Sequence, residues 1–270
     1  MSRTLSVGIS PCPNDTFVWG ALALGQIRLP FRLVFFYEDI QELNRAAQEG
    51  RFDVVKLSFF QYALLLPRAY RLLSVGAALG YGVGPLLVAK SPLSPDELRQ
   101  APIGIPGLGT TAYSLFRFYA PQAEKVIELR YDQLMPAVAR GDLRAAVIIH
   151  EGRFTYAQYG LICLEDLGAY WTQKTGYPIP LGGLAVKRTV PRGPLERALR
   201  RSLRLAWQGR VAQLSAFVAA HAQELDPAVQ QAHIQLYVNS YTRFLRAEGW
   251  AAVRYYLQWV RRHRSLFKLA

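Results

Sequence analysis

The sequence contains few of the residues that build disulfide frameworks, metal centres and acidic surfaces. Its 270 residues include 2 cysteines, 4 histidines and 19 acidic residues, against 32 lysines and arginines. Cys12 and Cys163 lie far apart and lack the spacing of metal ligands, so we expect neither a disulfide framework nor a metal site. Cys12 lies between two prolines, where it is either a reactive thiol or a small residue that fills a turn.

Long apolar runs are also lacking. Residues 72–89 are uncharged, but four glycines and Pro85 interrupt them, which fits a strand, a loop and a second strand better than a membrane span. The N-terminal segment has one basic residue and a short apolar run, unlike a secretory signal. We therefore expect a cytoplasmic protein that has no membrane partner.

The scarcity of acidic residues gives the chain a net charge of +13, which by itself would suit a nucleic acid, an anionic membrane or an anionic small molecule. Residues 192–268 hold 13 of the basic residues and 4 of the acidic ones, a net charge of +9. No RNP-like, zinc-finger or helix-turn-helix pattern accompanies this charge. We interpret it as a solvated, arginine-rich surface, and we expect a small anionic substrate rather than a nucleic acid.

The first 190 residues or so alternate short β-rich runs with helical patterns, which predicts an α/β fold. Capping patterns at Asp39–Glu42 and Ser94–Glu97 mark two helix starts. The runs 53–57 and 144–149 are almost continuously apolar, as in strands of a parallel sheet that is covered on both faces. The predicted strands are residues 4–9, 31–37, 53–57, 71–76, 85–89, 102–106, 125–129, 144–149 and 179–186.

Two lobes are expected, because segments near 90–94 and 176–182 are punctuated by proline and glycine and would connect them. We expect residues 1–90 plus 181–270 to form the first α/β lobe, and residues 91–180 the second. A ligand would lie in the cleft between the lobes. The C-terminal part is predicted to be a helical tail, which is a candidate homodimer surface, with helices on residues 194–222, 227–239 and 241–263.

Chemistry-bearing residues follow four of the predicted strands, where a helix start provides free N–H groups and a positive dipole end. In the first loop, Asn14 or Asp15 is expected to cap a helix near Thr16. Both are also candidate substrate-binding residues, because the prolines around Cys12 fix the shape of this loop.

The second strand end carries Lys56 and Ser58, which share one face of their strand because side chains alternate. A lysine among apolar residues is costly to bury unless it is paired. Its partner would be either a ligand carboxylate or an internal acidic residue.

The third strand end leads into Gly107-Leu-Gly-Thr-Thr-Ala112, where Thr110 and Thr111 open a helix. The glycines allow close approach of the backbone to a ligand, and the paired hydroxyls favour anion binding over plain capping. The sequence is neither a Walker loop nor a GxGxxG loop, so it does not specify a nucleotide phosphate.

His150 closes the fourth strand and can exchange a proton near neutral pH. The alternative is a histidine that is hydrogen-bonded in the cleft wall, with Glu151 as an orienting neighbour. The other histidines, His221, His233 and His263, lie in the helical tail and are interpreted as surface or packing residues.

Five of these segments, in this order, resemble the 1,4-dihydroxy-6-naphthoate synthases of the futalosine route to menaquinone. They are Ser10–Phe17, Lys56–Ser58, Gly80–Pro85, Gly109–Thr111 and Ile149–Gly152. The resemblance covers residues 7–152 by motif and the whole chain by length and order, although the tail carries no matching motif.

This resemblance implies a two-lobed, periplasmic-binding-protein-like (type II) fold with a helical C-terminal region and no export signal. It implies a carbon–carbon lyase that converts cyclic dehypoxanthinyl futalosine to 1,4-dihydroxy-6-naphthoate without a metal or an organic cofactor. By matching motif, His150 is the proton acceptor, and the residues that contact the substrate are Lys56, Leu57, Ser58, Thr110 and Thr111.

Two other functions are compatible with the same sequence. Chorismate dehydratase belongs to the same pathway and has a similar fold, and fold alone does not separate two enzymes. The other is a non-catalytic binding protein for a small carboxylate, against which the absence of a recognisable signal sequence counts.

Overall fold

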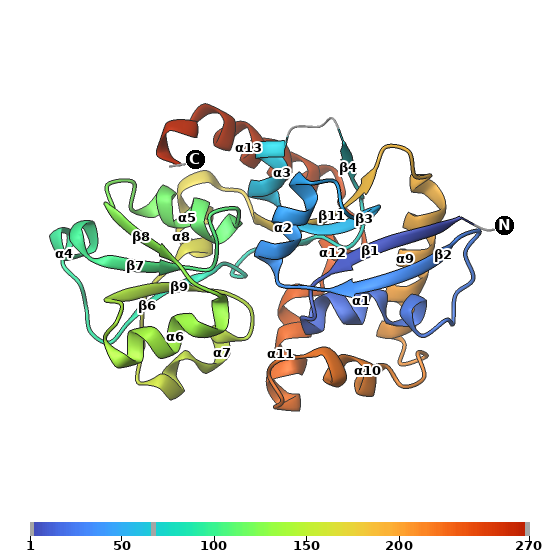
Figure 1. Ribbon diagram of the computed structural model, residues 1–270, viewed down its shortest axis with the longest axis horizontal. Helices are drawn as coiled ribbons and strands as arrows, with labels where there is room; N and C mark the ends of the chain where they lie inside the picture. The colour runs from blue at the N-terminus through green and yellow to red at the C-terminus, as the bar shows by residue number, and fades with distance from the viewer. Residues whose placement is uncertain (1–2, 66–68, 268–270) are drawn as a thin grey trace.

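The computed structural model describes residues 3–65 and 69–267, which fold around two mixed β-sheets lying side by side (Figure 1). The first sheet has the order β2-β1-β3-β11-β4, and β5 also pairs with β11. Its strands are β1 (Thr4–Ile9), β2 (Arg32–Tyr37), β3 (Val54–Ser58), β4 (Tyr70–Leu72), β5 (Ala78–Gly80) and β11 (Ile179–Lys187). The second sheet has the order β10-β6-β9-β7-β8. Its strands are β6 (Leu86–Ala89), β7 (Pro102–Ile105), β8 (Lys125–Glu128), β9 (Ala145–Ile148) and β10 (Ile162–Asp166).

The expectation of parallel sheets is only partly correct. Strand β1 runs parallel to β2 and β3, and β7 runs parallel to β8 and β9. Strand β11 is antiparallel to β3, and β6 is antiparallel to β9. These two strands follow the chain's crossings from one sheet to the other, so they enter their sheets from the opposite direction.

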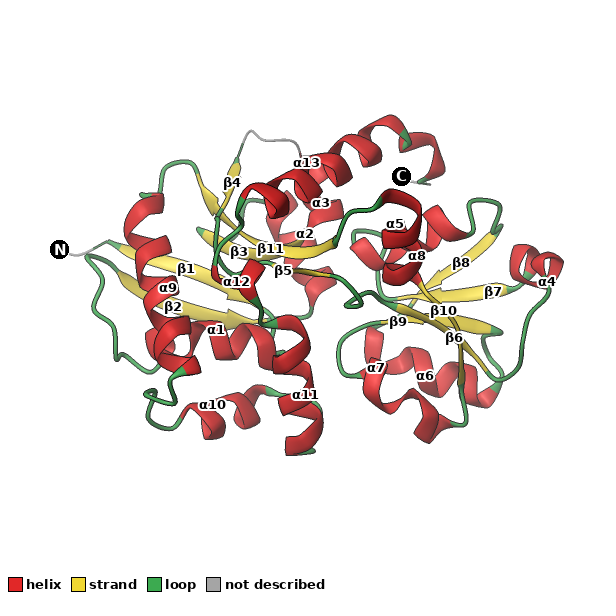
Figure 2. Ribbon diagram, turned by 180° about the vertical axis from the view of Figure 1, so that it is seen from behind, coloured by secondary structure: helices red, strands yellow, loops and turns green. Residues whose placement is uncertain are grey.

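Helices cover both faces of each sheet (Figure 2). Those joined to the first sheet are α1 (Pro13–Ala23), α2 (Ile40–Gln48), α3 (Phe59–Leu65), α9 (Arg192–Trp207), α10 (Leu214–His221), α11 (Pro227–Tyr237), α12 (Ser240–Arg243) and α13 (Ala247–Arg262). Those joined to the second are α4 (Pro95–Gln100), α5 (Thr111–Tyr119), α6 (Tyr131–Arg140), α7 (Gly152–Thr155) and α8 (Leu167–Thr175). In the described parts of the chain, no helix combines the length and the apolar character needed to cross a bilayer.

Most predicted elements are present, and the strands differ from the prediction in three places. Asp39 and Ser94 cap α2 and α4 as expected, and Ser94 forms a full capping box with Glu97. The predicted strand 71–76 ends at Leu72. Beyond it, the Ser74 N–H donates to the Glu196 carboxylate instead of to a strand. The short β5 and the acidic β10 were not predicted.

The predicted helix 194–222 is also wrong, because it is two helices. Helix α9 ends at Trp207, and α10 begins at Leu214. Between them, Gly209 and Gln213 adopt φ values of +65° and +60°, in the left-handed region that a continuing helix cannot use. The predicted helix 241–263 is divided in the same way into α12 and α13.

The chain crosses between the sheets twice, between β5 and β6 and again before β11. Strand β6 lies in the second sheet although it was assigned to the first lobe, so the first crossing precedes residue 86. The division into domains at residues 90 and 180 stays a prediction. The first crossing packs closely on the start of α8, where a Cβ added to Gly84 would lie 2.3 Å from the backbone of Gly168.

One of three buried hydrophobic clusters joins both sheets. It joins Leu57 of β3, Ile103 of β7 and Tyr256 of α13 in a single buried cluster. Helix α13 reaches the second sheet's helices directly, since Trp259 packs on Trp171 with ring centroids 5.4 Å apart. Helix α13 therefore packs against both lobes and holds them together, and Figure 1 shows it above the two lobes.

We expect Gly84→Ala to lower the free energy of unfolding by about 1–3 kcal/mol, because the new methyl group would displace the backbone of Gly168. Urea unfolding followed by circular dichroism measures this change. The control is Gly193→Ala, where the nearest atom is the flexible end of Arg197 at 3.3 Å. An equal stability for both variants would contradict the close approach of the two glycines.

Candidate functional site

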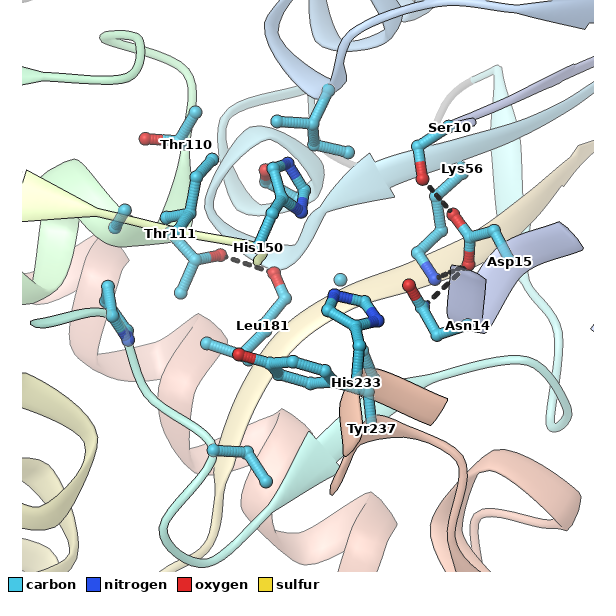
Figure 3. A pocket seen from close by; sticks show the side chains of 18 residues that line it. Ser10, Asn14, Asp15, Lys56, Thr110, Thr111, His150, Leu181, His233 and Tyr237 are labelled. Atoms are coloured by element: carbon cyan, nitrogen blue, oxygen red, sulfur yellow. Dashed lines mark hydrogen bonds and ion pairs between the residues drawn. The ribbon is translucent and has the colours of Figure 1, made fainter. Parts of the chain in front are cut away.

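A cavity of about 650 Å³, including the part open to solvent, lies where the two lobes meet (Figure 3). Of the predicted site residues, the cavity is lined by Asn14, Asp15, Lys56, Ser58, Thr110, Thr111 and His150. Leu57 is the exception. Its side chain is 1% exposed and belongs to the core, because alternation along β3 turns it away from Lys56 and Ser58.

The first loop differs from the prediction in its capping. Helix α1 begins at Pro13, and Cys12 occupies the cap position without a side-chain hydrogen bond to the helix. Asp15 does not cap, because its carboxylate accepts hydrogen bonds from the Ser10 hydroxyl at 2.7 Å and from the Asn14 amide at 3.0 Å. The loop thus shapes one wall of the cavity through Asp15.

Lys56 is paired within the protein. Its Nζ lies 2.5 Å from Asp15 Oδ1, and both side chains are almost completely buried. Lys56 also donates to the carbonyl of Gly76 at 3.3 Å. Of the two partners that the sequence left open, the structure shows the internal acidic residue, which neutralises the lysine at the cavity wall.

Ser58 is held by Asn44, a fully buried residue of α2. The Asn44 amide accepts a hydrogen bond from the Ser58 N–H and donates to the Ser58 hydroxyl at 3.1 Å. It also donates to the carbonyl of Gly109 at 3.1 Å, while Gly109 N–H donates to Gln41. Helix α2 therefore ties the glycine loop of one lobe to the β3 end of the other.

The hydroxyls of Thr110 and Thr111 both have partners in the protein. Thr110 caps α5 by accepting from the Tyr113 N–H, and Thr111 donates to the carbonyl of Leu181 at 2.7 Å. The backbone N–H groups of Thr111 and Ala112 belong to the first turn and have no intrahelical acceptor. These N–H groups, rather than the hydroxyls, are the donors available to an anion in the cavity.

His150 projects from the end of β9 with a φ of +56°, in the left-handed region. Such a conformation is uncommon for a residue other than glycine and is frequent at functional sites. Its Nδ1 lies 3.2 Å from Cys12 Sγ, which comes from the opposite lobe, and Tyr131 packs edge-on against its ring. Burial lowers the pKa of His150, an effect that the charges of Glu151 and Asp15 oppose and that of Lys56 reinforces.

Cys12, His150 and Glu151 form a cluster whose ligand atoms all lie within 4.8 Å of one another. Burial raises the pKa of the Cys12 thiol well above its usual range, and the nearby Glu151 adds to this effect. Burial also raises the pKa of Glu151. The donor set is one that zinc accepts, but the prediction that no metal is bound stays a prediction.

His233 is a cavity residue that the sequence did not reveal. It was interpreted as a surface or packing residue of the tail, whereas it lines the cavity together with Tyr237. Its side chain is 1% exposed, and neither ring nitrogen has a hydrogen-bond partner. The spacing of Gln230, His233 and Tyr237 on one face of α11 was the available signal, but this spacing also fits ordinary packing.

Comparisons with known sequences all assign the chain to the same family. A family model described as menaquinone biosynthesis matches residues 5–262. A 1,4-dihydroxy-6-naphthoate synthase from Thermus thermophilus is 44% identical, with 93% of this chain and 92% of the relative covered. An enzyme of the same name from Streptomyces coelicolor is 40% identical, with 93% and 90% covered.

Solved structures agree on the fold. Protein AF1704 from Archaeoglobus fulgidus is 31% identical with a TM-score of 0.90, and 98% of this chain and 99% of that one are covered. The alkanesulfonate-binding protein SsuA from Xanthomonas axonopodis pv. citri, bound to MOPS, is 15% identical with a TM-score of 0.75, over 99% and 95% of the two chains. These similarities confirm the two-lobed, periplasmic-binding-protein-like fold.

We expect Lys56→Met to lower the free energy of unfolding by about 3–5 kcal/mol, because it leaves the Asp15 carboxylate buried without its cation. Adding Asp15→Asn removes that charge, so the double variant should lose less stability than the two single variants together. Urea unfolding of the parent protein and the three variants measures this coupling.

The matched control is Lys187→Met, which removes a partly exposed lysine 3.6 Å from Asp53. Exposed ion pairs contribute about 0–1 kcal/mol, so this variant should remain close to the parent protein. Strictly additive losses at Lys56 and Asp15 would show that the two charges do not depend on each other.

Proposed function

Because the chain belongs to the menaquinone biosynthesis family, together with the 1,4-dihydroxy-6-naphthoate synthases, we propose that it converts cyclic dehypoxanthinyl futalosine to 1,4-dihydroxy-6-naphthoate with His150 as proton acceptor. That it is an enzyme of this family follows from its similarity over nine-tenths of its length. The substrate, the lyase chemistry and the role of each residue belong to the proposal.

The observation that carries the proposal is the position of His150. The imidazole reaches the cavity from the end of β9, beside Cys12 of the other lobe. Its lowered pKa keeps it unprotonated near neutral pH, as a general base requires. Its left-handed backbone is held by the surrounding fold, which fixes the ring in place.

The proposed reaction begins when His150 takes a proton from a hydroxyl of the sugar-derived part of the substrate. That oxygen forms a carbonyl as the adjacent carbon–carbon bond breaks. The electrons of the broken bond pass into the bicyclic ring, which takes the proton back from His150 and becomes aromatic. The sugar-derived fragment leaves as a carbonyl compound, and no external oxidant or reductant is needed.

The tautomer of His150 follows from this role. A base must present a lone pair, so Nε2 is unprotonated and Nδ1 carries the hydrogen. The Nδ1–H group then donates to Cys12 Sγ, 3.2 Å away. Cys12 therefore orients the base, and its raised pKa keeps it a neutral thiol that does not compete for the substrate proton.

The substrate's anionic groups are expected at the start of α5. The N–H groups of Thr111 and Ala112 are free of intrahelical partners there, and the positive end of the helix dipole favours an anion. Lys56 contributes little net charge because Asp15 neutralises it. Asn14 and Ser58 complete the polar lining, while Leu57 supports the site from the core.

Several finer expectations belong to the same proposal. The reaction as written uses no metal or organic cofactor. The substrate is a small anion from a biosynthetic pathway, so we expect a cytoplasmic enzyme. Neither a nucleic acid nor a membrane has a part in the mechanism.

A homodimer through the helical tail stays a prediction. Chorismate dehydratase and simple carboxylate binding are the alternatives, which turnover assays with each substrate distinguish.

His150→Asn is expected to lower kcat by about 10²–10⁴-fold, because it removes the general base. Asparagine tolerates the left-handed backbone better than alanine does, so this variant should stay folded. Production of 1,4-dihydroxy-6-naphthoate from the cyclic substrate measures the effect, and thermal unfolding verifies the fold.

The control is His263→Asn, which alters an exposed histidine at the end of α13, outside the cavity. It should retain full turnover. Nearly full activity of a folded His150→Asn protein would overturn the assignment of the base.

The pH profile tests the same assignment. Since the unprotonated imidazole acts, kcat/KM should be level near neutral pH and fall on the acid side as His150 becomes protonated. Its pKa is lowered, so this fall should lie below pH ~6.5, the ordinary histidine value.

The Glu151→Gln variant shows whether His150 or its neighbour Glu151 is the group that titrates on the acid side of the profile. The Glu151 charge raises the pKa of His150, so removing it should move the acid limb of the profile to still lower pH. If the limb vanished in this variant, it would belong to Glu151 instead.

A further inference from the structure

We propose that His233 is a substrate-binding residue, which hydrogen-bonds a neutral oxygen of the sugar-derived part of the substrate. The inference rests on the proposed function, and it adds a second imidazole to the site. It also assigns a role to the helical tail, in which the sequence shows no motif.

The first observation is an unpaired polar group in the cavity wall. His233 is 1% exposed, and neither Nδ1 nor Nε2 has a hydrogen-bond partner. Other buried side chains in the described part of the chain also have unpaired polar atoms, but of these residues His233 alone lines the cavity. Leaving a buried polar group unpaired is unfavourable, so a partner from the cavity's contents accounts for its presence here.

The second observation is that the capping and packing of α11 fix the position of the His233 ring. Asp226 caps α11, with its carboxylate accepting from the Ala228 N–H at 2.7 Å, and Pro227 occupies the first turn. The helix packs on α1 and β5, which also border the cavity. Figure 3 shows the His233 ring directed into the cavity beside Tyr237, whose ring centroid lies 4.5 Å away.

The electrostatic surroundings define what this ring recognises. Burial lowers the pKa of His233 well below its usual range, and the charges of His150 and Lys56 act in the same direction. A neutral imidazole offers one N–H donor and one lone pair. This combination suits a hydroxyl or a carbonyl oxygen, whereas a carboxylate is better served by the N–H groups at the start of α5.

The two histidines face the same part of the substrate. Both rings line the same cavity, His150 from the end of β9 and His233 from α11. Since His150 acts on the sugar-derived part, His233 is placed to hold a neighbouring oxygen of that part. His150 exchanges the proton, and His233 fixes the orientation.

Three proteins test the proposal: the wild type, His233→Leu and His233→Gln. With the cyclic substrate, we expect His233→Leu to raise KM by about 10- to 100-fold, because a substrate oxygen loses its partner. Its kcat should change little, since the hydrogen bond exists in both the ground state and the transition state. His233→Gln supplies a donor and an acceptor again, so it should recover most of the loss.

A stability measurement separates binding from a structural role. Without substrate, His233→Leu should unfold at the same temperature as the wild type or higher, because the removed nitrogens had no partner. A lower unfolding temperature with an unchanged KM would show that the ring only supports the wall, and the inference would be overturned. His263→Leu, at an exposed position, should alter neither quantity.

The outcome also distinguishes this inference from the proposed function. If the wild type turns over the substrate and the leucine variant has an unchanged KM, the inference fails while the proposed function stands. If the wild type neither binds nor converts the substrate, the proposed function fails, and the inference fails with it.

Discussion

The buried ion pair between Lys56 and Asp15 is the constraint on which the site depends. A lysine in the middle of an otherwise apolar strand is tolerated only because a carboxylate lies 2.5 Å away. Asp15 is itself fixed by Ser10 and Asn14, so the pair joins the first loop to the end of β3. Without it, neither the wall of the cavity nor its charge distribution would be the same.

Burial governs the protonation of both histidines, and the charges around each ring modify its effect. Burial lowers the pKa of His150, and the charges of Glu151 and then Asp15 oppose this effect. This imidazole is therefore the one suited to the proposed proton exchange. At His233 the charges of His150 and Lys56 act in the same direction as burial, lowering the pKa further, and the ring remains neutral. Two identical side chains in one cavity thus acquire different chemistry from the charges around each of them.

The sequence predicted most of the fold because its signals were local. Apolar runs marked the main strands, and the Ser94–Glu97 capping box marked α4. It also placed seven of the eight expected residues at the cavity, since each followed a strand that ends there. Leu57 was included by matching motif, but strand alternation turns its side chain into the core. His233 was missed because its role depends on how α11 docks, which no local pattern encodes.

Among the described residues, the strong positive charge of the chain does not enter the cavity. The one lysine of these residues that lines it, Lys56, is neutralised by Asp15, and the proposed anion binding relies on backbone N–H groups whose number does not depend on composition. The tail that carries much of the charge nevertheless supplies two structural elements of the site. Helix α11 contributes an uncharged ring, and α13 holds the lobes together through Tyr256 and Trp259, both buried in the shared core. The tail therefore acts on the site through shape and packing, and most of its arginines are exposed to water.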